Sequence, residues 1–438
     1  GKSLCLVMTS GNRAEEPIQI DGSEAARKLS GLADAFLDHD RGIFMRADDS
    51  VIKVTGPSNR LSFLRRARGY VPEPVALRDG GPDVLGVGAD LKNTFTLMKD
   101  RYAVISQHIG DMENIETLSF FEETLDNLKS VYRVKPVAIA YDLHPGYMST
   151  KWALRQEGVE KTGVQHHHAH IASVMAEKGI KRKVIGVAFD GTGYGTDGTL
   201  WGGEFLIATP IDFKRAGHLR HVPLPGGEAA IKEPWRTAVS FILEATGNEA
   251  GHYLERVGFY GRYGSDMLEN IIKITNMKEV SPLSSGAGRL FDAVSALLGT
   301  CDRNTFEGEA AIALEAATAQ GVTDDYPVDV KFKEPIEVDF SYTIISIIED
   351  ITKGVEKDLI AAKFHNTVAE AIAMVVKELY YLTDIHDVVL SGGVFQNDYL
   401  LDRTIRKLLP EGLNIYINEI VPSNDGGISL GQAYILRE

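Results

Sequence analysis

A seven-residue pattern that occurs twice places the strongest constraint on the fold of this chain. VLGVGAD at residues 84–90 recurs as VIGVAFD at residues 184–190, an offset of 100 residues. Each copy precedes a turn with Thr or Gly and then another strand-like run, at residues 94–97 and 200–207. A duplication of this kind predicts two βββα-like halves that close on a cleft and offer two phosphate loops. Chance similarity between common apolar residues is the alternative.

Four histidines in five positions open the stretch that leads into the second copy. His166 and His170 are four residues apart, so their imidazoles share one face if residues 171–180 continue as a helix. Two neutral imidazoles one turn apart can bind a divalent transition metal. A pair at helical spacing can equally be solvated or packed.

Glycines follow the second copy directly. The apolar strand expected over residues 184–189 ends in Asp190, and a loop with Gly191, Gly193 and Gly195 comes next. Glycine lets backbone N–H groups approach phosphate oxygens, because no Cβ stands in the way. The alternative is an ordinary hairpin turn. The closeness of the histidines and glycines in the sequence favours a functional site.

Composition limits the class of protein. With 438 residues, 44% of them apolar, the chain is long enough for two to four domains. No apolar run approaches the roughly 18 residues of a membrane span, and the first ten residues lack signal-peptide features. Cys5 and Cys301 form no CxxC motif, which favours a reducing cytoplasm. The net charge of −15 argues against a general nucleic-acid binder.

Residues 1–77 form a region of their own before a proline-containing linker. A buried strand is expected over residues 4–8, with no room upstream for the rest of a sheet, and a second strand over residues 43–51. Ser10 and Asn12 on the strand-end turn, with arginines nearby, would suit a nucleotide or an acyl phosphate. An Asx/ST turn beside a solvated basic face is the equal alternative.

Polar residues follow further predicted elements. The strand at residues 137–141 ends in Asp142, at the position where open α/β sheets place ligands. Asp292 is expected in the first turn of a helix over residues 290–298, where it could accept hydrogen bonds from a ribose diol. Complementing a helix N-terminus is its other common role.

The C-terminal third repeats the arrangement of strand, polar turn and helix. A long amphipathic helix over residues 359–382 leads to a strand at 388–390, and then to Gly392, Gly393 and Asn397. This arrangement predicts a nucleotide-sized notch. The last strand leads to Asp425, which is either a helix N-cap or a carboxylate that completes the His166/His170 site.

Five motifs, in order, resemble the carbamoyltransferase module of hydrogenase maturation proteins of the HypF type: VQHHHAHIAS, AFDGTGYGTDGTLWGGEF, GRLFDAVSALLG, LSGGVFQN and SNDGGISLGQA. That module is related to tRNA threonylcarbamoyladenosine factors and antibiotic O-carbamoyltransferases. MTSGN, MRADDSV and RRARGYVP resemble the second half of the adjoining YrdC-like domain.

The resemblance implies a duplicated sugar-kinase/Hsp70-like (ASKHA, RNase H-like) α/β fold, preceded by part of a YrdC-like domain. The implied divisions are 1–77 for the YrdC-like part, 78–180 for the first Kae1-like lobe and 181–438 for the second, with a possible return toward the first lobe at the C-terminus. The implied metal ligands are His166, His170, Asp190 and Asp425, the first three also catalytic. The implied nucleotide contacts are Gly191, Thr192, Gly193, Asp292, Gly392, Gly393 and Asn397. The implied YrdC-like contacts are Ser10, Asn12, Arg65 and Arg68.

The activity implied by the resemblance is carbamoyl transfer. Carbamoyl adenylate, made from carbamoyl phosphate and ATP, would carbamoylate the C-terminal cysteine of the partner maturation protein HypE for cyanide synthesis. ATP, Mg²⁺ and an iron or zinc ion are the implied cofactors, and neither nucleic acid nor membrane is an expected partner. The acylphosphatase domain, the zinc fingers and the first half of the YrdC-like domain are missing from the sequence, so we expect no start from carbamoyl phosphate alone.

Two other functions stay open at the level of sequence. The same fold could carbamoylate tRNA or a small hydroxyl compound, although the acidic net charge counts against tRNA. A nucleotide-binding regulatory module without acyl transfer is a third hypothesis, and it would bind nucleotide independently of His166 and His170.

Overall fold

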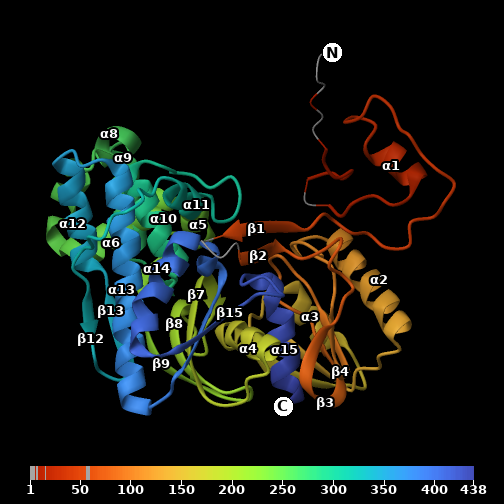
Figure 1. The fold of residues 1–438 in the computed structure, drawn as a ribbon. Coiled ribbons are helices and arrows are strands. Elements are labelled where there is room, and N and C mark those ends of the chain that lie inside the picture. The colour runs from red at the N-terminus through yellow and green to blue at the C-terminus, as the bar shows by residue number, and fades with distance from the viewer. Residues whose placement is uncertain (1–4, 6–7, 15, 56–59) are drawn as a thin grey trace. The chain divides into compact units, whose positions relative to one another are not determined.

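A computed structural model describes residues 5, 8–14, 16–55 and 60–438, which divide into two compact units (Figure 1). Unit 1 comprises residues 1–54, 61–164 and 419–438, and unit 2 comprises residues 55–60 and 165–418. The division thus follows Val164, whereas the lobe boundary proposed from the sequence lies at 180/181 and remains a proposal. Residues 4, 6 and 7 of the predicted first strand lie outside the described residues.

The N-terminal part of unit 1 contains helix α1 (Gly22–Lys28), followed by strands β1 (Val51–Thr55) and β2 (Arg60–Arg65), which form a two-stranded sheet. The prediction of a strand from residue 43 was wrong, because the strand begins only at Val51. Ile43 and Phe44 are exposed, so their apolar side chains have no sheet face to cover. Arg46 instead donates to the carbonyl oxygen of Ile18 at 3.0 Å.

A four-stranded sheet in the order β4-β3-β5-β6 forms the centre of unit 1. Strands β3 and β4 are antiparallel, whereas β3 with β5 and β5 with β6 are parallel. The predicted strands at 84–87 and 137–141 are present in this sheet. Its elements are β3 (Val75–Gly86), β4 (Thr96–Ile105), α2 (Ile115–Tyr132), β5 (Ala138–Asp142), α3 (Met148–Arg155), β6 (Glu160–Val164) and the C-terminal α15 (Ile428–Arg437).

Unit 2 contains a nine-stranded sheet whose main path is β12-β13-β9-β8-β7-β14-β15, with β10 and β11 at its side. The strands are β7 (Val184–Tyr194), β8 (Leu200–Ala208), β9 (Phe213–Leu219), β10 (Val222–Pro223), β11 (Leu283–Ser284), β12 (Asp329–Lys331), β13 (Ile336–Asp339), β14 (Asp387–Ser391) and β15 (Asn414–Ile417). The α-helices are α4 (His166–Lys178), α5 (Glu228–Lys232), α6 (Pro234–Thr246), α7 (Ala250–Arg256), α8 (Phe259–Tyr263), α9 (Ser265–Thr275), α10 (Ala287–Leu298), α11 (Glu309–Ala316), α12 (Ser341–Thr352), α13 (Lys357–Thr383) and α14 (Asp398–Leu408). The 3₁₀ turns are η1 (Gly247–Glu249), η2 (Gly393–Gln396) and η3 (Leu409–Glu411).

The two sheets share one topology, which confirms the predicted duplication. In unit 2, β7 is antiparallel to β8 and parallel to β14, and β14 is parallel to β15. The order β8-β7-β14-β15 therefore matches β4-β3-β5-β6 of unit 1. The halves differ in that β9 continues the antiparallel part of unit 2, whereas in the described part of unit 1 the next regular element after β4 is α2.

Each sheet packs against a helix that follows the last parallel strand of the other unit. Helix α4 comes after β6 and packs on β7, β8 and β14, whereas α15 comes after β15 and packs on β3, β4 and β5 (Figure 1). The repeated glycine of the sequence pattern lies under each of these helices. A Cβ on Gly86 would lie 2.3 Å from the carbonyl oxygen of Ser429 in α15. A Cβ on Gly186 would lie 2.7 Å from the Ile171 side chain in α4.

Helix α13 is the one helix of the described chain that is long and apolar enough to cross a membrane by length and composition alone, with a mean hydropathy of 1.4 over its best window. Of that window, 78% is buried. Ile360, Phe364 and Val368 are among its core residues, packed with apolar residues of β7 and α10. We therefore interpret α13 as a core helix of unit 2.

Substitution of Gly86 with Ala should destabilise the protein by about 2–3 kcal/mol, because the added Cβ meets the backbone of α15, which cannot move without disrupting the packing. Gly186→Ala should cost less, since its neighbour is a side chain that can change rotamer. Chemical unfolding measures both effects. Gly261→Ala is the control, because a Cβ at that position meets nothing within 4 Å. Equal stability of G86A and G261A would contradict the close helix packing.

Candidate metal and nucleotide site

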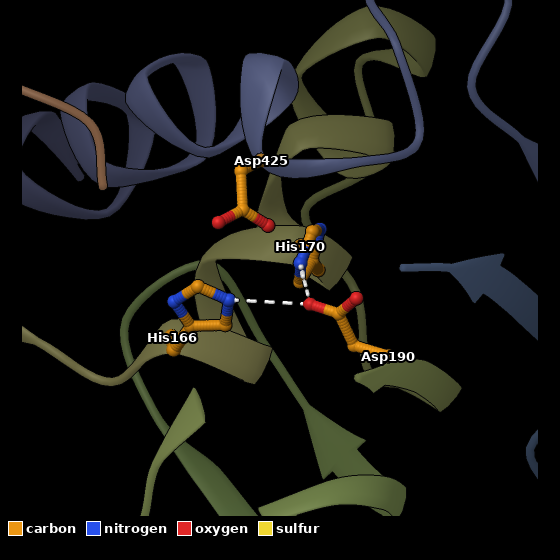
Figure 2. Close-up of side chains that lie close together, drawn as sticks. All are labelled: His166, His170, Asp190 and Asp425. Carbon is orange, nitrogen blue, oxygen red and sulfur yellow. Dashed lines mark hydrogen bonds and ion pairs between the residues drawn. The ribbon is translucent and has the colours of Figure 1, made fainter. Parts of the chain in front are cut away.

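Two histidines and an aspartate of unit 2 lie together at the start of α4 and the end of the buried part of β7. Gln165 caps α4 by accepting a hydrogen bond from the backbone N–H of His168 at 2.9 Å. This cap starts the helix at His166, so His170 follows one turn later on the same face. Nε2 of His166 and Nε2 of His170 lie 3.4 and 3.2 Å from Oδ2 of Asp190 (Figure 2).

The neighbouring histidines stabilise the ionised form of Asp190. Burial by itself raises the pKa of this carboxyl, but hydrogen bonds and charge interactions with His166 and His170 outweigh burial and hold the pKa well below its usual range. The other carboxylate oxygen, Oδ1, accepts from the backbone N–H of Gly191 at 2.8 Å and of Gly393 at 3.3 Å. Asp190 is therefore ionised, and it joins its own strand β7 to two other segments of unit 2, the start of α4 and the turn at Gly393.

The donor atoms of these three side chains suit a transition metal. One ring nitrogen from each histidine and one carboxylate oxygen lie within 4.8 Å of one another. Imidazole nitrogen and carboxylate oxygen together are a common ligand set for zinc and for iron(II). Both rings are fully buried, which limits competition from water.

Asp425, also labelled in Figure 2, belongs to unit 1 and is the first residue of the 3₁₀ turn η4 (Asp425–Gly427). Asp425 does not cap this turn, as one of the two predictions had it. The cap is Asn424, whose side chain accepts a hydrogen bond from the backbone N–H of Gly426 at 3.0 Å. Its part in a metal site remains a prediction.

The glycines after Asp190 lie in a strand and not in an open loop, so the predicted strand end at residue 189 was wrong. Strand β7 continues to Tyr194, with a shift in its pairing to β8 between Phe189 and Gly193. A Cβ on Gly193 would lie 2.6 Å from the His167 ring, so glycine is required where α4 meets this strand. The N–H group of Gly191 is already donated to Asp190.

Gly392 and Gly393 form the turn between β14 and η2. Gly392 has a φ of +104°, and a Cβ there would lie 2.2 Å from the carbonyl oxygen of Phe189. Only glycine therefore fits where this turn crosses β7. The turn brings the N–H of Gly393 to Asp190, so the glycines predicted for nucleotide binding also build the histidine–aspartate cluster.

The side chain of Asn397 has structural partners on both ends of its amide. Its Oδ1 accepts from the backbone N–H of Leu400 at 2.9 Å and so caps α14. Its Nδ2 lies 2.9 Å from Nε2 of His365, whose Nδ1 lies 2.7 Å from the carbonyl oxygen of Ala361. This pattern fits a neutral His365 that donates from Nδ1 and accepts at Nε2. Contact of Asn397 with adenosine remains a prediction.

Asp292 lies in the second turn of α10, because the helix begins at Ala287 and not at residue 290 as predicted. It is fully buried, and Oδ2 lies 3.1 Å from Nη2 of Arg289. Burial raises the pKa of Asp292, and the charge of Arg289 opposes this rise. The position one turn inside the helix does not support the alternative role of complementing the helix N-terminus.

Sequence reasoning missed a buried charged network beside this site. Glu204 of β8 is fully buried and accepts from Nε of Arg215 at 2.6 Å and from Nη2 at 3.1 Å. It also accepts from the Ser285 hydroxyl at 2.5 Å, just before α10. The signal available was a glutamate in an otherwise apolar strand, LWGGEFLIA. The network ties β8 to the residues that precede α10.

The predicted YrdC-like contacts lie in unit 1. The Ser10 hydroxyl donates to Oδ1 of Asn12 at 2.6 Å, and Nδ2 of Asn12 donates to the carbonyl oxygen of Glu16 at 2.9 Å, as in the Asx/ST-turn alternative. Arg65 is the last residue of β2. Arg68 is exposed, with Asp49 at 3.6 Å. Their binding roles remain predictions.

Comparison with known proteins identifies the family. A family model described as "Carbamoyltransferase, Kae1-like Domain, second subdomain" matches residues 186–432, and one described as "HypF Kae1-like domain" matches residues 79–177. The chain belongs to the HypF carbamoyltransferase family. A Sua5/YciO/YrdC family model, described as "Telomere recombination", matches residues 2–67, in agreement with the predicted YrdC-like part of this HypF-family chain.

Named relatives agree with this assignment. Carbamoyltransferase HypF2 of Cupriavidus necator is 38% identical over 99% of this chain and 56% of its own length, and carbamoyltransferase HypF of Synechocystis sp. is 40% identical over 98% and 56%. A HypF homolog of Cupriavidus necator is 35% identical over 80% of this chain and 91% of its own length. The chain thus spans a little over half the length of the first two relatives.

Solved HypF structures confirm the predicted fold class. Full-length HypF in a phosphate- and nucleotide-bound form superposes with a TM-score of 0.92 at 44% identity, covering 98% of this chain and 66% of that one. HypF of T. kodakarensis gives a TM-score of 0.88 at 34% identity, covering 98% and 56%.

The buried His365 should make stability depend on pH. Burial lowers the pKa of His365 to about 4, while its contact with Ala361 opposes the shift. A lowered histidine pKa means that the unfolded chain binds the proton first, so this contribution is complete above pH 6.5 and is lost as pH falls toward 4. Between pH 7 and 5 the loss should be about 2 kcal/mol. Urea unfolding of the wild type and of His365→Gln at pH 7 and pH 5 separates the contribution of His365 from that of other groups. An equal change in the free energy of unfolding for both proteins would contradict the lowered pKa of His365.

Proposed function

We propose that this chain transfers the carbamoyl group of carbamoyl adenylate, made from carbamoyl phosphate and ATP, to the C-terminal cysteine thiol of a HypE-type maturation protein. The observation that carries the proposal is the cluster of the buried His166 and His170 with the half-buried Asp190, next to the glycines of β7, in a chain of the HypF family. The reaction would serve cyanide ligand synthesis for nickel–iron hydrogenase in the cytoplasm.

The chemistry explains why a nucleotide is needed. Carbamate is a poor acyl donor, because an oxide or hydroxide would have to leave from its carbonyl carbon. In the adenylate, the leaving group is the phosphate of AMP. The partner's thiolate would attack the carbonyl carbon, the bond from that carbon to the phosphate oxygen would break, and AMP would leave with the bonding electrons. The thiol proton passes to solvent or to a basic group.

The metal ligands in this proposal are His166, His170, Asp190 and Asp425. Iron or zinc held by them would supply a Lewis acid for phosphate or carbonyl oxygens, and Mg²⁺ would accompany the ATP phosphates. The imidazoles are held for this role by the cap of α4 and by their contacts with Asp190. The first three residues are also the proposed catalytic group.

The nucleotide would be bound by the elements around this cluster. Backbone groups of the β7 glycines and of the β14–η2 turn are proposed for the phosphates and the adenosine side, Asp292 for the ribose, and Asn397 for the adenosine side. The proposed contacts are Gly191, Thr192, Gly193, Asp292, Gly392, Gly393 and Asn397. In the YrdC-like part, we propose Ser10, Asn12, Arg65 and Arg68 for the nucleotide or carbamoyl group.

The nucleophile comes from the partner, so the cysteines of this chain need no catalytic role. Burial raises the pKa of the Cys301 thiol, which makes its reactive thiolate scarcer at neutral pH. Cys5 is exposed in the N-terminal segment. Neither residue belongs to the histidine–aspartate cluster.

Combined substitution of His166 and His170 with Ala should abolish metal binding, because it removes two of the proposed ligands. We expect about one transition-metal ion per wild-type chain and close to none in the double variant, measured by elemental analysis after dialysis against iron or zinc. His252→Ala is the control, since it removes an exposed imidazole from α7. Full metal content in the double variant would contradict the site.

Radiolabelled carbamoyl adenylate tests the acceptor. We expect label on the HypE-type partner but not on a partner whose C-terminal cysteine is replaced by serine. The double variant H166A/H170A should transfer about 100-fold more slowly, with unchanged far-ultraviolet circular dichroism. The same assay offers tRNA as acceptor. Labelling of tRNA alone would overturn the choice of acceptor, and transfer to the partner at the wild-type rate by the double variant would overturn the role of the cluster.

A further inference from the structure

Arg289 of α10 is a buried cation whose hydrogen-bonding capacity is largely unused. Its side chain is 9% exposed. Nε and Nη1 are buried, and neither has a hydrogen-bond acceptor among the described residues. A guanidinium carries five N–H donors and cannot lose its charge in a protein, so buried donors without acceptors require an explanation.

The ion pair with Asp292 satisfies this guanidinium only in part. Nη2 lies 3.1 Å from Oδ2 of Asp292, yet that oxygen is itself buried and makes no hydrogen bond of acceptable geometry among the described residues. Arginine binds carboxylate and phosphate best through two parallel N–H bonds. The pair with Asp292 provides charge but not this arrangement, so Arg289 retains donors for an anion.

The position of Arg289 beside Gly191 indicates which anion it serves. A Cβ on Gly191 would lie 3.2 Å from Nη2 of Arg289, and a Cβ on Gly288 would lie 2.9 Å from Cα of Gly191. The first turn of α10 is thus packed directly against the β7 glycines. Gly286, at the N-cap of this helix, has no side chain that could accept hydrogen bonds from the first backbone N–H groups of α10. The positive end of the α10 dipole therefore lies next to Gly191 as well.

The backbone N–H groups of the glycines cannot by themselves hold a phosphate at this site. The N–H of Gly191 is donated to Asp190, and so is the N–H of Gly393. Two of the backbone donors expected to hold phosphate are therefore engaged by a carboxylate. Asp190 also places a negative charge next to Gly191, which would repel a phosphate unless a cation offsets it.

We propose that Arg289 is a phosphate-binding residue of this site, which donates from its guanidinium to a phosphate oxygen of the bound adenine nucleotide. It would exchange part of its contact with Asp292 for the ligand, which leaves that carboxylate available to the ribose. The proposal rests on the proposed function, since it assigns a further residue to the same nucleotide site. It identifies the ligand group as a phosphate and not the nucleoside.

The test compares adenosine, AMP and ADP by isothermal titration calorimetry on the purified full chain. Arg289→Ala should weaken at least one of the two phosphate-bearing ligands by about 10- to 100-fold, the usual effect of losing a charge-assisted hydrogen bond, and should leave adenosine within about twofold. Arg256→Ala is the matched control, because it removes the same charge from α7 of the same unit, where the guanidinium lies over Tyr253. The control should change none of the three affinities.

Arg289→Gln provides a second variant if the alanine variant unfolds, since its amide can still donate to Asp292 while the positive charge is lost. Thermal unfolding without ligand shows whether each variant is folded. Equal weakening for adenosine and ADP would overturn the proposal, because Arg289 would then act only by holding Asp292, and unchanged affinities would overturn it as well. Failure of the wild type to bind any of the three ligands would instead overturn the proposed nucleotide site itself.

Discussion

The need to compensate one largely buried carboxylate organises the centre of unit 2. Asp190 accepts from His166 and His170 on one oxygen and from the backbone of Gly191 and Gly393 on the other. An ionised carboxylate without such partners would cost several kcal/mol. The start of α4, the glycines of β7 and the β14–η2 turn are therefore tied to one position. The same contacts hold the imidazoles that we propose as metal ligands, so the stability of this region and the proposed chemistry depend on the same group.

In unit 1, the aspartate at the equivalent position of the repeated pattern also accepts several hydrogen bonds, but from groups other than histidine. Asp90 of unit 1 follows β3 as Asp190 follows the corresponding part of β7, and it accepts from the backbone N–H groups of Met148 and Ser149 at 2.6 and 3.0 Å. The Ser149 hydroxyl donates to it at 2.9 Å. Burial raises the pKa of Asp90, although these hydrogen bonds oppose the shift. Both copies thus use an aspartate to hold the turn after the next parallel strand, and the second copy adds the proposed metal ligands.

The close packing of one helix on each sheet explains the repeated glycine of the sequence pattern. Helix α15 covers the sheet of unit 1 and α4 covers that of unit 2, so each sheet is covered by the helix that follows the last parallel strand of the other half. Gly86 and Gly186 allow those helices to approach. The residues that follow β6 and β15 are therefore constrained twice, by packing on a sheet and by the polar residues at the start of each helix.

Sequence alone determined the features that depend on local periodicity and on ordered motifs. It predicted the duplicated halves, the long helix α13, the strands β14 and β15, the shared face of His166 and His170, and the family. Tertiary structure decided the rest. Residues 43–50 have a strand-like pattern, yet in the described structure only Asp49 pairs, in a single bridge with Arg68. The glycines after Asp190 suit a loop or an irregular strand equally until β8 pairs with them. Asp190 and Glu204 have partners far away in the sequence, Gly393 and Ser285, and only the folded sheet brings these groups together.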